Sequence, residues 1–178
     1  MPFPLAAKNI LLVVAPSQFR DEEYTSPRRV FEDRGATVRV ASTQRGPAMG
    51  MLGERVDPDL LVKDARATDW DAVVVVGGSG SPDYLWDHAP LLALLRERAD
   101  AGRVVAGICL SGAVLARAGV LEGKRATCWP APEAVAALGE GGASYEKARV
   151  VVDGRVVTAD GPASAREFGE AVVRVLLE

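Results

Sequence analysis

The residue best suited to chemistry is Cys109, in the segment "RVVAGICLSGAVLARAG" at 103–119. A valine-rich run typical of a buried strand ends at this cysteine, and a small-residue segment typical of a helix follows it. With glycine two residues before the cysteine, and serine and glycine two and three residues after it, the segment is close to the G-x-S-x-G nucleophile elbow, with cysteine as the nucleophile. A helix N-terminus at this point is expected to lower the thiol pKa and favour the thiolate. The alternative is an inert core cysteine, since free cysteines are often buried.

A second strand end lies in "VVVVGGSGSPDYLW" at 73–86, where the valine run breaks into Gly77 and Gly78. Backbone N–H groups freed at such a turn can point at a developing oxyanion. Gly78 and Leu110, the residue after the cysteine, are therefore a candidate donor pair. The alternative is a turn that only needs glycine. A phosphate loop is excluded, because no Gly-Lys-Ser/Thr follows.

A third site is the acidic stretch in "FRDEEYTSP" at 19–27, which contains Asp21, Glu22 and Glu23. Any one of these carboxylates is explained by the preference for acidic residues in a first helical turn. However, the first strand of a doubly wound sheet is expected to be central, so the loop after it opens into the same crevice as Cys109. We therefore expect one of the three carboxyls to face the thiol.

The elements that position these sites alternate between valine-rich runs and longer amphipathic segments. This alternation predicts an α/β fold, specifically a flavodoxin-like three-layer α/β/α sandwich with a mostly parallel central sheet and β-hairpin additions. We expect one domain over residues 1–178, with no linker or repeat. Asp153-Gly154 between two valine runs predicts a hairpin. Strands are expected in 9–15, 37–42, 71–78 and 103–109, and helices over 21–34, 89–102 and 162–177.

Composition narrows the function classes. The net charge of -3 is spread along the chain without a basic stripe, so we expect no nucleic-acid partner. No run approaches the roughly 20 apolar residues of a membrane span. The N-terminal segment is expected to be a strand and not a signal peptide, which favours a cytoplasmic protein. With two cysteines and one histidine, neither a structural disulfide nor a zinc site is expected.

With these sites in order, the chain resembles the ThiJ/PfpI family, the superfamily of the parkinsonism-linked protein deglycase and the PfpI intracellular peptidases, with a class I glutamine amidotransferase-like fold. The resemblance covers nearly the whole chain. The matching segments are "FRDEEYTSPRRVFEDRGATVRVAS", "DAVVVVGG", "AGICLSGAVLARAGVLEGKRAT" and "VVTADGPASAREF".

The resemblance implies a role for four residues. Cys109 matches the family nucleophile, and Glu23, four residues before Pro27, matches the carboxyl that hydrogen-bonds its sulfur. Gly78 and Leu110 match the oxyanion donors. A carboxyl that donates to a thiolate must keep its proton, so a raised pKa is expected for Glu23.

The chain departs from the family at both of its histidine positions. The residue after the cysteine is Leu110 where peptidase-like members have histidine, and Trp129 stands where deglycase-like members have one. His88, the only histidine, is expected to be a surface or capping residue that reaches a site only if its loop folds over it. Asp83 lies near an acidic position of the peptidase-like members, and its loop aligns only with a gap. Trp129 is a candidate pocket residue that sets substrate size.

The resemblance implies a cysteine-dependent enzyme of the glyoxalase III or deglycase type. It would act on small reactive carbonyls or damaged protein, without metal or organic cofactor, in stress protection. One alternative is a non-enzymatic redox-sensing or chaperone-like stress protein that uses an oxidisable Cys109. Another is a PfpI-like cysteine peptidase or amidohydrolase, which the missing imidazole disfavours. The resemblance also implies a homo-oligomer, either a dimer or a hexamer.

Overall fold

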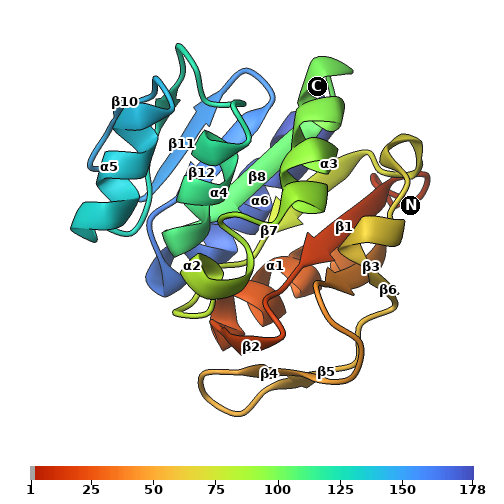
Figure 1. Cartoon of the computed structure of the whole chain (residues 1–178). Coiled ribbons are helices and arrows are strands. Elements are labelled where there is room, and N and C mark those ends of the chain that lie inside the picture. The colour runs from red at the N-terminus through yellow and green to blue at the C-terminus, as the bar shows by residue number, and fades with distance from the viewer. Residues whose placement is uncertain (1–2) are drawn as a thin grey trace.

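The computed structural model describes residues 3–178 and forms three layers, with helices on both faces of a central sheet (Figure 1). The first two residues of the predicted domain lie outside the described part. The strands are β1 (Asn9–Val13), β2 (Ser17–Phe19), β3 (Thr37–Ser42), β4 (Ala48–Gly50), β5 (Arg55–Val56), β6 (Leu60–Leu61), β7 (Ala72–Val75), β8 (Val104–Ile108), β9 (Arg125–Ala126), β10 (Ser144–Tyr145), β11 (Val150–Asp153) and β12 (Val156–Ala159). The α-helices are α1 (Asp21–Asp33), α2 (Ser81–Tyr84), α3 (Ala89–Asp100), α4 (Gly112–Arg117), α5 (Pro132–Glu140) and α6 (Ala165–Leu176). The 3₁₀ turns are η1 (Val62–Asp64), η2 (Ala67–Asp69), η3 (Cys109–Ser111) and η4 (Pro162–Ser164).

The central sheet has the order β11-β12-β8-β7-β1-β3-β6. All neighbouring pairs are parallel except β11 and β12. The prediction of a flavodoxin-like, mostly parallel sheet is therefore confirmed. The first strand is interior rather than central, because β7 occupies the middle of the order. It still pairs with β7, so the loop after β1 opens beside the loop after β7.

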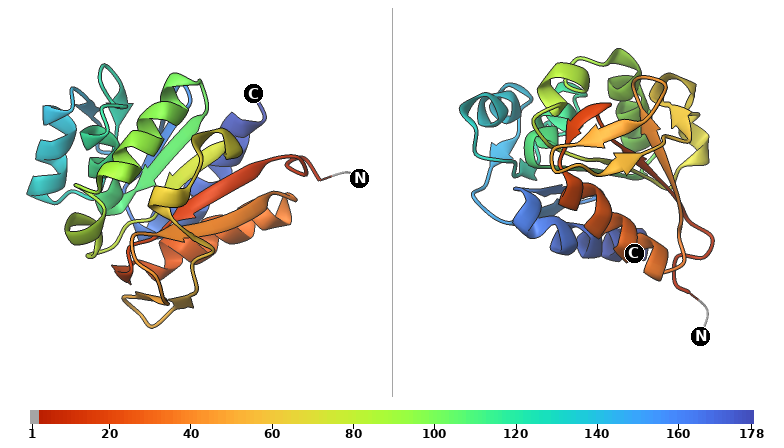
Figure 2. Two further views of the ribbon diagram at one scale, coloured as in Figure 1. Left: turned by 45° about the vertical axis from the view of Figure 1, so that its right-hand side comes forward. Right: turned by 90° about the horizontal axis from the view of Figure 1, so that it is seen from below.

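The core lies on both faces of this sheet, because successive residues of a strand point to opposite sides. Ile10 and Leu12 of β1 belong to one apolar cluster and Leu11 and Val13 to the other. Helices α1 and α6 supply the first cluster, and α3, α4 and α5 supply the second. Figure 2 shows α1 and α6 side by side beneath the sheet in the view from below.

The predicted turns and helices are largely confirmed. Val150 to Asp153 pairs antiparallel with the strand after Gly154, whose φ of 62° is the left-handed conformation that this tight hairpin needs. The first crossover helix ends before Gly35 at φ 89°. The last helix is interrupted at its start, because Pro162–Ser164 forms a 3₁₀ turn before α6 begins.

Two small sheets, β2-β4-β5 and β9-β10, were not predicted from the sequence. Their strands have only two or three residues, too few to show an alternating pattern. The first sheet is held by Asp21, whose carboxylate accepts the Leu52 and Glu54 amides at 2.9 and 2.8 Å. No helix within residues 3–178 combines the length and apolar character that crossing a membrane requires.

Candidate active site

Cys109 lies at the sharp turn between β8 and α4, as the elbow pattern predicts. Its φ of 60° is a left-handed conformation that costs a non-glycine residue about 1–2 kcal/mol. Glycines make room for the turn: a Cβ on Gly107 would stand 2.8 Å from the Ser111 carbonyl oxygen, and one on Gly112 would stand 2.9 Å from the Cys128 Cβ. The nucleophile position is therefore strained and tightly enclosed, and Cys109 is only 6% exposed.

Glu23 reaches this turn from the first helical turn of α1 and is fully buried. Its carboxyl lies against the Cys109 thiol and the Gly77 amide, yet neither of its oxygens has a hydrogen-bond partner in good geometry. Burial raises the pKa of Glu23 to about 8, against the smaller opposing effect of the thiol contact. The carboxyl is therefore protonated at neutral pH, and its proton is available to the sulfur.

Gly77 is the point at which the carboxyl, the elbow and the glycine turn meet. A Cβ there would stand 2.5 Å from Glu23 Oε1, 2.6 Å from the Ile108 carbonyl oxygen and 2.7 Å from the Cys109 Cβ. Its own carbonyl accepts the Arg20 amide at 2.9 Å, which ties the loop after β1 to the loop after β7. Only glycine allows so close an approach.

The amides of Leu110 and Gly78 both point at the Cys109 sulfur and act to lower its pKa. Even so, burial first and the Glu23 charge second raise the pKa of the thiol above its ordinary value. The expected lowering by a helix N-terminus is therefore wrong in direction. A single 3₁₀ turn that begins at Cys109 leads into a six-residue helix, and burial of the thiol outweighs the two amides that favour the thiolate. Below about pH 8 Glu23 is uncharged, so its repulsion of a thiolate is then absent.

A buried hydroxyl pair joins the two turns, and sequence reasoning missed it. Ser111 Oγ donates to the Val76 carbonyl at 2.7 Å and contacts Ser81 Oγ at 2.8 Å. Because Ser111 has one hydroxyl proton, Ser81 must be the donor in that second bond. The Trp86 indole N–H also donates to the Leu110 carbonyl at 2.9 Å. The sequence feature that could have indicated this pair is a serine inside each of the two glycine-rich turns.

The other acidic residues of the opening loop have separate partners. Asp21 holds the turn between β4 and β5, and Glu22 pairs with Arg20 at 2.9 Å. Of the three carboxyls, only Glu23 faces the thiol, as one of them was expected to do.

The two accessory candidates do not join this group. His88 directly precedes α3, its Nε2 is buried without a hydrogen-bond partner, and burial lowers its pKa. Asp83 is exposed on α2. Across residues 3–178, no hydrogen bond or ion pair joins His88 or Asp83 to Cys109 or Glu23. Within the same range, no three His, Cys, Asp or Glu side chains are grouped so as to hold a metal ion.

Trp129 does lie beside the elbow. Its backbone amide donates to the Cys109 carbonyl at 3.2 Å, and its ring packs on Gly161. Cys128, the second thiol, is fully buried in the opposite core cluster, where burial raises its pKa to about 12. A hollow between α1 and α6, lined by Arg29, Arg166 and their neighbours, shares no residue with the Cys109 site.

Comparison with known proteins agrees with this geometry. The family described as the DJ-1/PfpI family matches residues 8–175. An uncharacterized protein of Methanocaldococcus jannaschii is 47% identical over 94% of this chain and 82% of its own length. A deglycase of Pyrococcus abyssi is 30% identical over 93% of this chain and 98% of its own. A glutathione-independent glyoxalase of Caenorhabditis elegans is 28% identical over 96% and 90%. The crystal structure of a ThiJ/PfpI domain protein of Brachyspira murdochii superposes with a TM-score of 0.88 at 41% identity, covering 94% of this chain and 95% of that one.

Proposed function

This chain belongs to the DJ-1/PfpI family, and we propose that it is a cysteine-dependent, cofactor-free enzyme converting small 2-oxoaldehydes into 2-hydroxy acids. The observation that carries this proposal is the buried pair of Glu23 and Cys109. A carboxyl that keeps its proton to about pH 8 lies directly against a thiol. The relatives named deglycase and glyoxalase support this type of activity.

In the first step, the sulfur of Cys109 adds to the aldehyde carbon and forms a hemithioacetal. The carbonyl π electrons move to oxygen, where the Gly78 and Leu110 amides stabilise the developing charge. The thiol proton ends on that oxygen by way of Glu23, which donates its own proton and is reprotonated. A group with a pKa near 8 is suited to this, since it gives and takes protons near neutral pH.

In the second step, Glu23 donates its proton to the ketone oxygen and removes the proton from the former aldehyde carbon, which gives an enediol. It then returns that proton to the neighbouring carbon and accepts the proton of the former aldehyde oxygen, so that it ends the step protonated. One carbon is oxidised and the next is reduced, so no external redox partner is needed. The product is a thioester on Cys109, and water hydrolyses it to the 2-hydroxy acid and the free thiol. The overall reaction consumes one water per aldehyde.

The absence of an imidazole from the described contacts of Cys109 favours aldehydes over peptides. A positioned general base typically contributes ~10²–10⁴ in rate, and an amide needs such help far more than a reactive aldehyde does. Leu110 and Trp129 occupy the two positions at which peptidase-like and deglycase-like members of the family have histidine. We therefore favour activity on reactive carbonyls over peptidase or amidohydrolase activity.

The proposal is tested by lactate formation from methylglyoxal in chelator-treated buffer. The wild type and Cys128→Ala are expected to form lactate, and Cys109→Ala is expected to form none. Lactate from Cys109→Ala at the wild-type rate would overturn the proposal. Peptidase activity is checked in parallel, since casein hydrolysis lost in Cys109→Ala would revive that alternative.

The redox-sensing or chaperone-like alternative is favoured by the same donors. Two amides and a protonated carboxyl around one sulfur would also stabilise the oxygens of a sulfinate. A folded wild type that forms no lactate, yet gains two oxygens on Cys109 under mild peroxide, would favour the redox-sensing alternative over the enzyme. We further propose that the protein is cytoplasmic and that it forms a homo-oligomer, a dimer or hexamer. Light scattering of the purified protein tests the oligomeric state.

A further inference from the structure

Trp129 is the large exposed side chain that adjoins the nucleophile. It is 45% exposed, although its backbone amide is bonded to the Cys109 carbonyl at 3.2 Å. Its six-membered ring lies against Gly161, where an added Cβ would come within 2.7 Å of Cε3 and 2.9 Å of Cζ3. The indole is thus packed against Gly161 on one side and exposed to solvent on the other.

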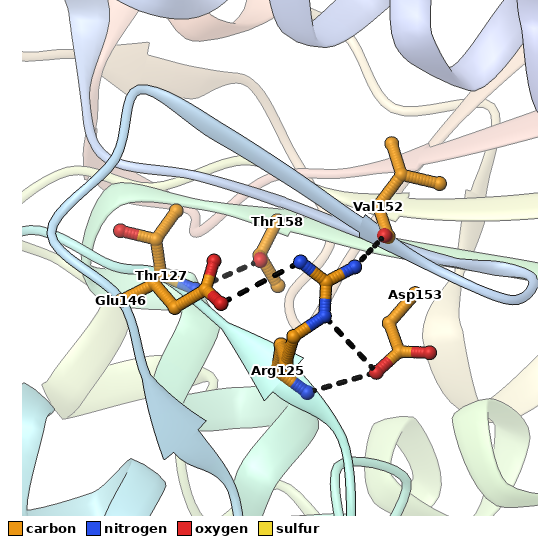
Figure 3. Close-up of polar contacts among 6 residues, drawn as sticks. All are labelled: Arg125, Thr127, Glu146, Val152, Asp153 and Thr158. Carbon is orange, nitrogen blue, oxygen red and sulfur yellow. Dashed lines mark hydrogen bonds and ion pairs between the residues drawn. The ribbon is translucent and has the colours of Figure 1, made fainter.

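The segment that carries this ring is held by a polar network (Figure 3). The Arg125 backbone amide donates to Asp153 at 2.9 Å, and its guanidinium donates to the Val152 carbonyl at 2.9 Å. Two residues on, the Thr127 amide donates to Thr158 Oγ1 at 3.0 Å. These bonds hold residues 125–127 against the β11–β12 hairpin, and they therefore fix the backbone that leads to Trp129.

Sheet register places the ring at the same edge as the sulfur. Strand β12 pairs in parallel with β8, and Ala159 is opposite Ile108. Gly161 therefore lies two residues beyond the end of one strand, and Cys109 lies one residue beyond the end of its neighbour. Adjacent strands are about 4.8 Å apart, so the seated indole is within reach of a small molecule attached to the sulfur.

We propose that Trp129 is a specificity-determining wall of the Cys109 site and that it selects 2-oxoaldehydes carrying a flat apolar group, such as an aryl ring. This inference rests on the proposed function and names its substrate class. An exposed indole face offers area and stacking to an aryl group and little to a methyl group. Leu110, half-buried next to the sulfur, adds apolar surface on the elbow side.

The first test compares phenylglyoxal with methylglyoxal, with mandelate or lactate as the measured product. Product is measured, and not loss of aldehyde, because arginines also consume 2-oxoaldehydes. For the wild type, we expect KM for phenylglyoxal to be the lower of the two. In Trp129→Ala that preference should fall by about 3- to 10-fold, the size of one aromatic contact. Trp129→Phe should retain most of the preference. Equal preference in wild type and Trp129→Ala would overturn the inference.

The second test does not depend on turnover. Cys109 is alkylated with iodoacetamide and with its N-phenyl analogue, and the ratio of the two rates is compared with that of a free thiol. The wild type should favour the phenyl reagent, and Trp129→Ala should lose that excess while reacting normally with iodoacetamide, which shows that its elbow is intact. A preference for the phenyl reagent without any turnover would contradict the proposed enzyme activity but would support the role of Trp129 as an aryl-binding surface. Turnover without a preference for the phenyl reagent or for phenylglyoxal would contradict the role of Trp129 alone.

Discussion

Substituting Glu23 with glutamine should change how the stability of the protein depends on pH. The Glu23 pKa is about 8 in the folded protein and 4.5 in the absence of burial. The folded state therefore binds this proton more tightly than the unfolded state does. Its contribution is fully present below pH 4.5, declines as the pH rises and is lost above about pH 8. Between pH 5 and pH 7, this linkage lowers the free energy of unfolding by about 2.5 kcal/mol.

The assay is urea unfolding at pH 5, 6, 7 and 8 for the wild type and Glu23→Gln. The wild type should lose about 2.5 kcal/mol more than the variant between pH 5 and pH 7, because all other titrating groups are shared. The matched control is Glu22→Gln, since Glu22 is partly exposed and its hydrogen bond to Arg20 lowers its pKa. That control should follow the wild type closely. Parallel curves for the wild type and Glu23→Gln would refute the reasoning, because Glu23 would then be ionised in the folded protein.

Two further predictions concern the turns around the sulfur. Gly77→Ala should cost about 1–3 kcal/mol of stability and abolish turnover, because its Cβ would overlap both Glu23 and backbone. Gly139→Ala, which meets nothing within 4 Å, should be neutral or stabilising by up to ~1 kcal/mol in thermal unfolding; equal losses in the two would contradict this account. Ser111→Ala should cost about 1–3 kcal/mol and slow Cys109 alkylation, since it unties the elbow from the glycine turn. Ser79→Ala, on an exposed hydroxyl, should stay within about 0.5 kcal/mol of wild type. A Ser111→Ala protein equally unaffected would show that the Ser81–Ser111 hydroxyl pair does not hold the two turns together.

Hydrophobic pattern was sufficient to predict the central sheet, except for its two-residue edge strand β6. Valine runs buried on both faces and separated by amphipathic segments have few alternatives to a parallel sheet with helices on both sides. The strand-to-helix turn at Cys109 was equally visible, because its neighbours had to be small. The β2-β4-β5 and β9-β10 sheets were not visible, because they depend on distant contacts such as that of Asp21 with the Leu52 and Glu54 amides.

The candidate site was predictable in part for the same reason. Sequence order put Glu23, Gly78 and Cys109 at one edge of the sheet, and the structure places them together. The direction of the thiol pKa shift was not predictable, since burial is a property of the whole fold and the dipole of a short helix is a local one. The Ser81–Ser111 bond was missed because it joins residues 30 positions apart.

The most direct test of the central claim is the rate of lactate formation from methylglyoxal by Glu23→Gln, measured with the alkylation rate of its Cys109. If Glu23 moves the proton between the two substrate carbons, the variant should form no lactate while its thiol is still alkylated. The wild-type rate should in turn change around pH 8, where Glu23 titrates. Lactate formed by Glu23→Gln at the wild-type rate would contradict the account, because the carboxyl would then have no part in the chemistry.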